Sequence, residues 1–196
     1  MTLRVSEVRR ETTETVVDVK VHIDGEGLAR VETGVGFFDH MLTILAKHSL
    51  MDLTVQAKGD TNVDDHHTVE DVGICLGKAV NQALGERANI HRFGHSAVPM
   101  DEALADVAID ISGRSYLVFN VKFPTDRIGS YDVQLTQEFL RAFCQHAGLT
   151  LHVNVPYGSN AHHMTEAVFK GLARALFHAA TISPRQVGIP STKGVI

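Results

Sequence analysis

The segments Phe38-Asp39-His40-Met41-Leu42 and His66-His67-Thr68-Val69-Glu70 decide the fold, because their pattern occurs twice in the chain. In the second half, Gln137-Glu138-Phe139-Leu140 precedes His162-His163-Met164-Thr165-Glu166. His40 and His48 have the same spacing as Glu138 and His146, and a strand-like segment follows each pair. Repetition of a long pattern indicates an internal duplication. The sequence therefore predicts two structurally equivalent halves.

Each half contains the same predicted order of strands and helices. Residues 15–23 alternate between apolar and polar positions, Asp24-Gly25 favours a turn, and a short strand returns, which together predict a hairpin. A helix, a strand and a long helix follow, and Gly85 ends the long helix. The expected segments are 15–23, 28–32, 37–47, 52–55 and 65–84 in the first half, and 104–111, 116–121, 132–145, 149–155 and 163–180 in the second.

These segments predict an α+β fold made of two halves of ββαβα type. A hairpin with helices on one side gives each half a small sheet with one covered face, and we expect the halves to be related by pseudo-twofold symmetry. We interpret residues 1–196 as a single domain with repeats at about 1–90 and 91–182. Residues 183–196 contain Pro184, Pro190 and Gly194, which predict an irregular C-terminal tail.

The composition disfavours several classes of function. Of the 196 residues 44% are hydrophobic, which suffices for a core, and the net charge of -5 leaves no basic surface for a nucleic-acid partner. Residues 1–10 are charged and strand-like, and no apolar run reaches membrane-spanning length, so we expect a cytoplasmic protein without a membrane partner. Cys75 and Cys144 lie in apolar helical patterns and are expected to be packed, reduced thiols. The 12 histidines suggest metal ligands or proton carriers.

The repeated His-His-x-x-Glu motif predicts two metal sites. On a helix, His66 and Glu70 share one face and can bind one ion, whereas a step of one residue turns His67 by about 100° toward a different neighbour. Each site would then combine a histidine and a glutamate of one motif, the odd histidine of the other motif, and one residue of the preceding helix. The first set is His162, Glu166, His67 and His40, and the second set is His66, Glu70, His163 and Glu138.

The ligand types restrict the chemistry further. Histidine with carboxylate and without thiolate fits Mn, Fe, Co or Zn. Asp64 and Asp65 are expected to cap the helix rather than to bind metal. Basic residues beside small hydroxyl residues and glycine suit a phosphate group, and the candidates are Arg92, Arg114, Lys170 and Lys193. A Walker loop, a dinucleotide glycine fingerprint and a Gly-x-Ser-x-Gly elbow are all missing from the sequence, so metal-assisted acid–base chemistry is favoured.

Several of these motifs occur together, in order, in one known family. They are Phe38–Leu42, Asp64–Gly73, Asp110–Arg114, Asn160–His163, Glu166-Ala167, Phe169-Lys170 and Pro190–Val195. By these segments the chain resembles, along essentially its whole length, the imidazoleglycerol-phosphate dehydratase family of histidine biosynthesis. It departs from the family at Ile44, where many members have a glutamine.

The resemblance implies the dehydration of D-erythro-imidazole-glycerol phosphate to imidazole-acetol phosphate with two Mn²⁺ ions per active site. It implies the same two ligand sets, although family members carry either His or Glu at the position of Glu138. The hydrogen to be removed is not acidic, so the expected route uses a metal-bound imidazolate and a diazafulvene-like intermediate. Glu14 or Glu166 would act as acid and base, and the sequence does not separate them.

The resemblance also implies substrate contacts and an assembly. His48 is expected to contribute to catalysis, and the metal ligands His40, His66, Glu70 and His162 are expected to contact the substrate as well. The other expected contacts with this small phosphate compound are Glu14, His48, Arg92, Arg114, Lys170, Ser191, Thr192 and Lys193. Family members form large hollow homo-oligomers, which predicts a 24-mer with active sites between subunits.

Two other interpretations use the same metals. Paired metals with acid–base carboxylates also suit a metal-dependent phosphoester hydrolase, which would release phosphate. A metal-stabilised storage or assembly protein would use the double histidines only to join subunits. That second alternative leaves Arg114, Lys170 and Lys193 without a role.

Overall fold

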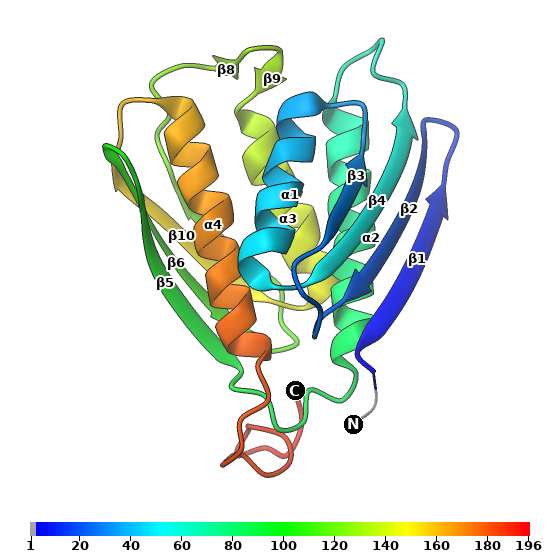
Figure 1. The fold of residues 1–196 in the computed structure, drawn as a ribbon, viewed down its shortest axis with the longest axis vertical. Helices are drawn as coiled ribbons and strands as arrows, with labels where there is room; N and C mark the ends of the chain where they lie inside the picture. Colours follow the sequence, from blue (N-terminus) through cyan, green and yellow to red (C-terminus); the bar gives the residue numbers. More distant parts are fainter. Residues whose placement is uncertain (1–2) are drawn as a thin grey trace.

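The computed structural model describes residues 3–196, a part of the chain that contains four helices lying between two four-stranded sheets (Figure 1). The strands are β1 Val5–Glu11, β2 Thr15–His22, β3 Ala29–Glu32, β4 Asp52–Gly59, β5 Phe93–Met100, β6 Ala103–Asp110, β7 Tyr116–Asn120, β8 Arg127–Ile128, β9 Tyr131–Asp132 and β10 Thr150–Tyr157. The helices are α1 Gly36–Ser49, α2 His66–Leu84, α3 Gln134–Ala147 and α4 Ala161–Ala180. The sheets have the equivalent orders β1-β2-β4-β3 and β5-β6-β10-β7. The predicted α+β fold with duplicated halves is confirmed.

The pairing of the strands differs from the predicted hairpins. β2 pairs antiparallel with β4, and β3 pairs parallel with the other side of β4, so the predicted pairing of 15–23 with 28–32 is wrong. The Asp52 carboxylate accepts the backbone N–H groups of Glu26 at 2.8 Å and Leu28 at 2.9 Å, which holds the connecting segment against the start of β4. The second predicted hairpin is wrong in the same way, because β10 lies between β6 and β7.

Each half also has an edge strand that the predicted ββαβα order leaves out, although residues 1–10 are strand-like in sequence. β1 and β5 pair antiparallel with β2 and β6, which makes the first half βββαβα, and the second half has the same order with the small β8-β9 pair inserted before α3. The signal for β5 is weak because Gly94 and Pro99 are both disfavoured in strands. Proline is tolerated there because β5 lies at the edge of its sheet.

The helices form the centre of the core. α2 of the first half packs against α3 of the second half, and α1 of the first half packs against α4 of the second half. This crossed pairing of helices is expected when two equivalent halves meet about a pseudo-twofold axis. Glycine allows the α2–α3 approach: a Cβ atom at Gly77 would lie 2.6 Å from the Phe143 carbonyl oxygen, and one at Gly73 would lie 2.9 Å from that of Phe139. Cys75 and Cys144 are buried as predicted, and burial raises the pKa of their thiols to about 11 and about 12.

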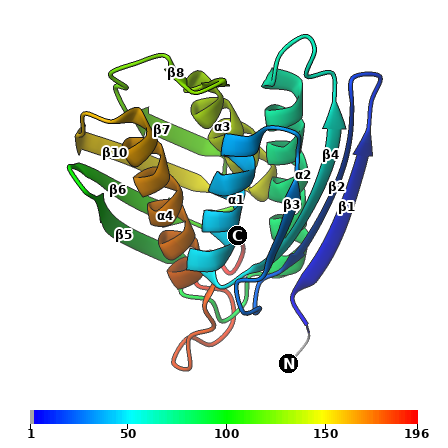
Figure 2. The ribbon, with the colours of Figure 1, turned by 45° about the horizontal axis from the view of Figure 1, so that its top comes forward.

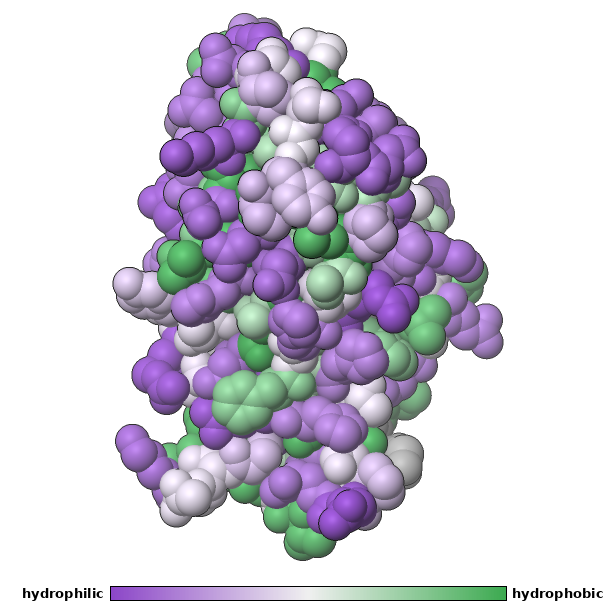
Figure 3. Space-filling view, turned by 90° about the vertical axis from the view of Figure 1, so that its left-hand side faces the viewer, coloured by the Kyte–Doolittle hydropathy of each residue, from purple (hydrophilic) through white to green (hydrophobic). Residues whose placement is uncertain are grey.

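All four helices begin at the same end of the molecule. Figures 1 and 2 show their first turns near β8 and β9, whereas the C-terminal tail lies beyond the last turn of α4 at the other end. The outward face of the second sheet is mostly hydrophilic, with apolar side chains scattered over it (Figure 3). Within residues 3–196, no helix combines the length and apolar character needed to cross a membrane.

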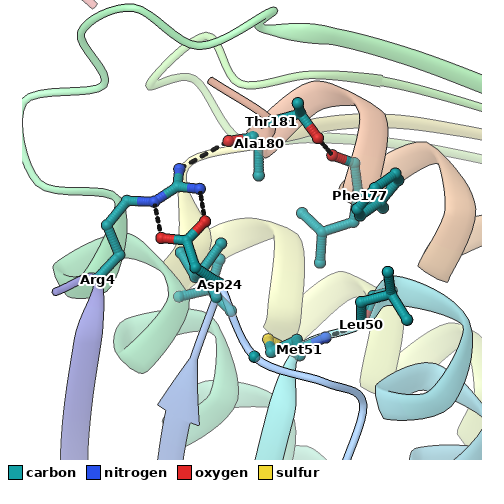
Figure 4. A pocket seen from close by; sticks show the side chains of 12 residues that line it. Arg4, Asp24, Leu50, Met51, Phe177, Ala180 and Thr181 are labelled. Atoms are coloured by element: carbon teal, nitrogen blue, oxygen red, sulfur yellow. Dashed lines mark hydrogen bonds and ion pairs between the residues drawn. The ribbon is translucent and has the colours of Figure 1, made fainter. Parts of the chain in front are cut away.

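A small cavity of about 140 Å³ lies among the ends of α1 and α4 and the turn after β2 (Figure 4). Its lining is largely apolar and includes Leu50, Met51 and Phe177. Arg4 closes one side, because its guanidinium pairs with the Asp24 carboxylate and donates to the Ala180 carbonyl oxygen at 2.7 Å. The lining contains none of the predicted metal or substrate residues, so we interpret this cavity as a packing feature that joins the two halves.

Candidate metal centre

Three predicted ligands meet where the N-terminal turns of α1 and α4 lie side by side. The Glu166 Oε2 atom lies 3.2 Å from His162 Nε2 and 3.6 Å from His40 Nε2. The ligand atoms of the three residues all lie within 4.8 Å of one another, and no other group of three or more His, Cys, Asp or Glu meets this condition among residues 3–196. Two imidazoles and one carboxylate in this arrangement are a suitable donor set for a divalent transition metal.

Local structure explains how α4 presents its ligands. His162 and Glu166 are separated by about one helical turn and therefore share a face. The Asn160 side chain caps the helix by accepting the backbone N–H groups of His162 at 2.9 Å and His163 at 3.4 Å. The Phe37 ring of α1 contacts the His162 ring edge-on, with 5.1 Å between centroids, and so fixes the two helix ends against each other. Of the two residues expected to cap α2, Asp64 accepts the backbone N–H of His66 at 2.8 Å, whereas Asp65 makes no side-chain hydrogen bond to the helix, so the expectation for Asp65 is wrong.

The charges around Glu166 keep its carboxylate ionised. Burial by itself would raise the pKa of Glu166, but the hydrogen bond and charge of Lys170 and the nearby His162 lower it below its usual value. The Lys170 Nζ atom lies 2.7 Å from Glu166 Oε1, so the other oxygen remains directed at the histidines. Further along α1, burial and then the charges of Lys170 and Arg174 lower the pKa of His48, which keeps that imidazole neutral.

The second histidine of each pair points away from its neighbour. The ring centroids of His66 and His67 lie 6.3 Å apart and those of His162 and His163 lie 6.1 Å apart. The rotation of about 100° between adjacent helical positions turns the two side chains of each pair toward different neighbours. His67 Nδ1 lies 3.1 Å from an Asp60 carboxylate oxygen and 3.7 Å from Glu14 Oε2. The predicted fourth ligand of the first set, His67, is therefore outside the cluster of the same chain.

His163 is held in an equivalent way. Its Nδ1 atom lies 2.7 Å from Glu102 Oε2. Hydrogen bonding from His163, followed by the backbone N–H of Ser159, lowers the pKa of Glu102 to about 2. The other predicted members of this set, Glu70 and Glu138, both face the Arg141 guanidinium, which is 3.9 Å from Glu70 Oε1 and in close contact with Glu138. One chain therefore assembles three ligands of the first set and leaves the second set dispersed.

The phosphate-binding candidates divide between the two ends of the molecule. Lys170 lies at the metal centre, whereas the other predicted contacts line one groove at the opposite end: Arg92, Arg114, Ser191, Thr192 and Lys193. Arg92 forms a bidentate pair with Asp110 and donates to the Pro190 carbonyl oxygen, which fixes the tail that forms one wall. The Arg114 side chain is 71% exposed and is the freer guanidinium in this groove.

The length of α4 separates the groove from the metal centre. The Arg92 backbone N–H donates to the Ala179 carbonyl oxygen near the end of α4, whereas His162 lies in its first turn. At about 1.5 Å per residue, the helix places these positions roughly 25 Å apart. A small substrate cannot contact both ends of one chain.

Sequence reasoning missed several residues of the site. Asp60, Glu102 and Arg141 contact predicted ligands, but isolated acidic or basic residues carry no spacing signal of their own. The duplication could have revealed Glu102, because it immediately precedes β6 just as Glu14 immediately precedes β2. The Ile44 side chain, at the position of the departure noted above, is buried about one turn of α1 beyond His40.

The fold and site together define a duplicated α+β protein with a histidine–carboxylate centre suited to a divalent metal. The chain matches the family model of imidazoleglycerol-phosphate dehydratase over residues 33–176. It is 54% identical to the imidazoleglycerol-phosphate dehydratase of Rhodopseudomonas palustris strain BisB5, with 98% of each chain covered, and 54% identical to that of Bacillus licheniformis, with 99% of this chain and all of the relative covered. The chain belongs to the imidazoleglycerol-phosphate dehydratase family.

Solved structures agree with this assignment. The imidazoleglycerol-phosphate dehydratase of Staphylococcus aureus superimposes with a TM-score of 0.84 at 37% identity, covering 91% of this chain and 99% of that one. The enzyme from Pyrococcus furiosus, in complex with (S)-C348, superimposes with a TM-score of 0.83 at 36% identity and covers 96% and 100% of the two chains. The family name denotes a hydro-lyase, so the predicted enzyme class is confirmed.

Proposed function

We propose that this chain dehydrates D-erythro-imidazole-glycerol phosphate to imidazole-acetol phosphate in histidine biosynthesis, with two divalent metal ions, Mn²⁺ above all, at each active site. The observation that carries this proposal is the cluster of His40, His162 and Glu166 in a member of this family. A cytoplasmic location remains a prediction from the sequence.

The donor set fits the proposed metal. Three donors of one chain converge, and His67 would complete the first set. The second set would be His66, Glu70, Glu138 and His163. Arg141 would have to leave its pairs with the two glutamates before these could bind an ion. When bound, the ions would supply positive charge that polarises the imidazole ring of the substrate.

The environments of the two candidate acid–base residues favour Glu14. Glu166 is buried, paired with Lys170 and directed at two imidazoles, and its pKa is lowered, which makes it a poor base. The Glu14 side chain is 53% exposed at the turn between β1 and β2 and lies 3.7 Å from His67. Glu14 would therefore take the proton from the carbon adjacent to the one that loses its hydroxyl as water, which leaves an enol, and would deliver a proton to the carbon that lost the hydroxyl as the ketone forms. The route through a diazafulvene-like intermediate remains a prediction.

The separation within one chain supports active sites between subunits. The metal centre and the groove of Arg114 and Lys193 are roughly 25 Å apart by the rise of α4, which exceeds the reach of a small phosphate ester. The substrate would bind the metal end of one subunit with its ring and the groove of another with its phosphate. A closed homo-oligomer satisfies this requirement for every subunit, in agreement with the predicted 24-mer.

Metal removal and restoration test this proposal. The protein would be treated with a chelator, reloaded with Mn²⁺ and supplied with imidazole-glycerol phosphate, and both ketone and inorganic phosphate would be measured. We expect ketone formation to require the metal and to proceed without phosphate release. Metal-dependent phosphate release would indicate the hydrolase, and fully loaded, assembled protein without turnover would indicate a storage or assembly role.

A further inference from the structure

Glu102 uses both carboxylate oxygens to organise the start of α4. Its Oε1 atom accepts the backbone N–H groups of Ser159 at 3.0 Å and Asn160 at 2.7 Å. Its Oε2 atom lies 2.7 Å from His163 Nδ1, so the histidine ring is joined to the same carboxylate that fixes the preceding loop. A histidine adjacent to a carboxylate carries its proton on the facing nitrogen.

The first half of the chain contains a related arrangement with a different carboxylate nearest to the histidine. His67, which corresponds to His163, places Nδ1 3.1 Å from Asp60 and 3.7 Å from Glu14. Glu14 and Glu102 occupy the same position, immediately before the second strand of their sheets. In both halves Nδ1 of the second histidine therefore lies against a carboxylate, which Asp60 supplies in the first half and Glu102 in the second. The two halves keep this kind of contact although the carboxylate comes from different positions.

We propose that Glu102 is a positioning residue that holds His163 with its proton on Nδ1 and its Nε2 free to bind a metal ion. This inference rests on the proposed metal-dependent function. Nε2 has only a long contact with Asp101 Oδ2 at 3.8 Å, so the nitrogen that must act as ligand is not committed to a hydrogen bond. A carboxylate behind a ligating histidine fixes the orientation of the ring and increases its basicity.

A purely structural role for Glu102 makes a different prediction. If its function were only to accept the backbone N–H groups of Ser159 and Asn160, a glutamine would replace it well, because the amide oxygen accepts the same hydrogen bonds. In the positioning role glutamine is harmful. Its NH₂ group would face His163 Nδ1 and donate to it, which moves the ring proton to Nε2 and blocks metal binding there.

The test compares Glu102→Gln and Glu102→Ala with Asp101→Asn in the assembled protein. Asp101→Asn is a matched control, because it removes one charge from the same turn without touching His163 Nδ1. Manganese affinity and stoichiometry per chain would be measured by equilibrium dialysis with elemental analysis, and folding by the thermal midpoint of the metal-free protein.

We expect wild type and Asp101→Asn to bind two ions per chain with similar affinity. Glu102→Gln should bind one of the two ions about 10–100-fold more weakly while its metal-free thermal midpoint stays close to that of the wild type. Glu102→Ala should lose both thermal stability and affinity. Wild-type affinity for both ions in Glu102→Gln would overturn this inference alone, whereas a wild-type protein that binds no manganese would overturn the proposed function with it.

Discussion

Two inactive variants should restore each other's activity if the active site combines two chains. His162→Ala removes a ligand at the metal end, and Arg114→Ala removes an exposed guanidinium at the groove end, roughly 25 Å away along α4. Neither change disturbs the core. A site that takes its metal end from one subunit and its groove from another can therefore be fully intact in a mixed assembly, although every chain carries a defect.

The expected recovery follows from random mixing. With equal amounts of the two variants, the metal end is intact in half of the chains and the groove in the other half, so about one quarter of the sites contain both intact parts. We would co-express the variants with different tags, purify assemblies that contain both, and measure turnover against the wild type. We expect about one quarter of the wild-type rate.

A matched pair provides the control. A mixture of His40→Ala and His162→Ala should stay inactive, because both changes damage the metal end of their own chain. The shared site would be refuted if the first mixture were no more active than its separate variants, in assemblies that keep the wild-type size and about three quarters of the wild-type metal content, because only half of the chains lose one of their two ions.

Four further predictions follow from the structure. Glu14→Gln should lower kcat by at least about 100-fold with the bound metal retained, whereas Glu166→Gln should also lose metal, as measured by kinetics and elemental analysis of the same preparations. His67→Ala should reduce both metal content, measured by elemental analysis, and assembly size, measured by light scattering. Assemblies of wild-type size with full metal content would contradict ions that are shared between chains. Arg4→Ala should lower the free energy of unfolding in urea by about 1–3 kcal/mol, because it removes an ion pair with Asp24 and a bond to a helix-end carbonyl. Arg4 lowers the pKa of the Asp24 carboxyl group, so the ion-pair part of this stabilisation is fully present above about pH 4 and should fade as pH falls through the lowered folded pKa, whereas the bond to the Ala180 carbonyl should remain. Gly77→Ala should cost about 1–3 kcal/mol in the same urea assay, because its Cβ would approach an α3 carbonyl oxygen to 2.6 Å, and an unchanged unfolding midpoint would contradict the close α2–α3 packing.

The helices could be predicted from the sequence more completely than the sheets. Apolar spacing and flanking residues are local, so the expected helix at 65–84 agrees with α2 at His66–Leu84. Strand order depends on residues that are distant in sequence. Asp24-Gly25 is a plausible hairpin turn, but the Asp52 side chain bonds to the backbone of the segment that follows it. As a result β4, and not β3, pairs with β2. β5 was missed because Gly94 and Pro99 obscure its alternation.

The site shows the same division between local and distant information. Helical spacing predicts that His162 and Glu166 share one face of a helix, and the duplication adds His40 to the same set. The structure brings these three residues together. Helical spacing cannot say which chain supplies the last ligand of a set. It also cannot show that Glu102 reaches His163, because the two residues lie on different elements and no motif contains both.

In the proposed assembly, the geometry of the double histidines would couple metal binding to association. In both copies adjacent helical positions differ in direction by about 100°, so the second histidine faces a different neighbour from the first. All four helices begin at one end of the molecule (Figure 1), yet His67 and His163 are held by carboxylates of their own half instead of joining a cluster in their own chain. Under the proposed function, His67 and His163 would become metal ligands only where a neighbouring chain supplies the rest of the site. Ions that bridge chains would then favour the assembled state by mass action, and assembly would in turn complete the sites.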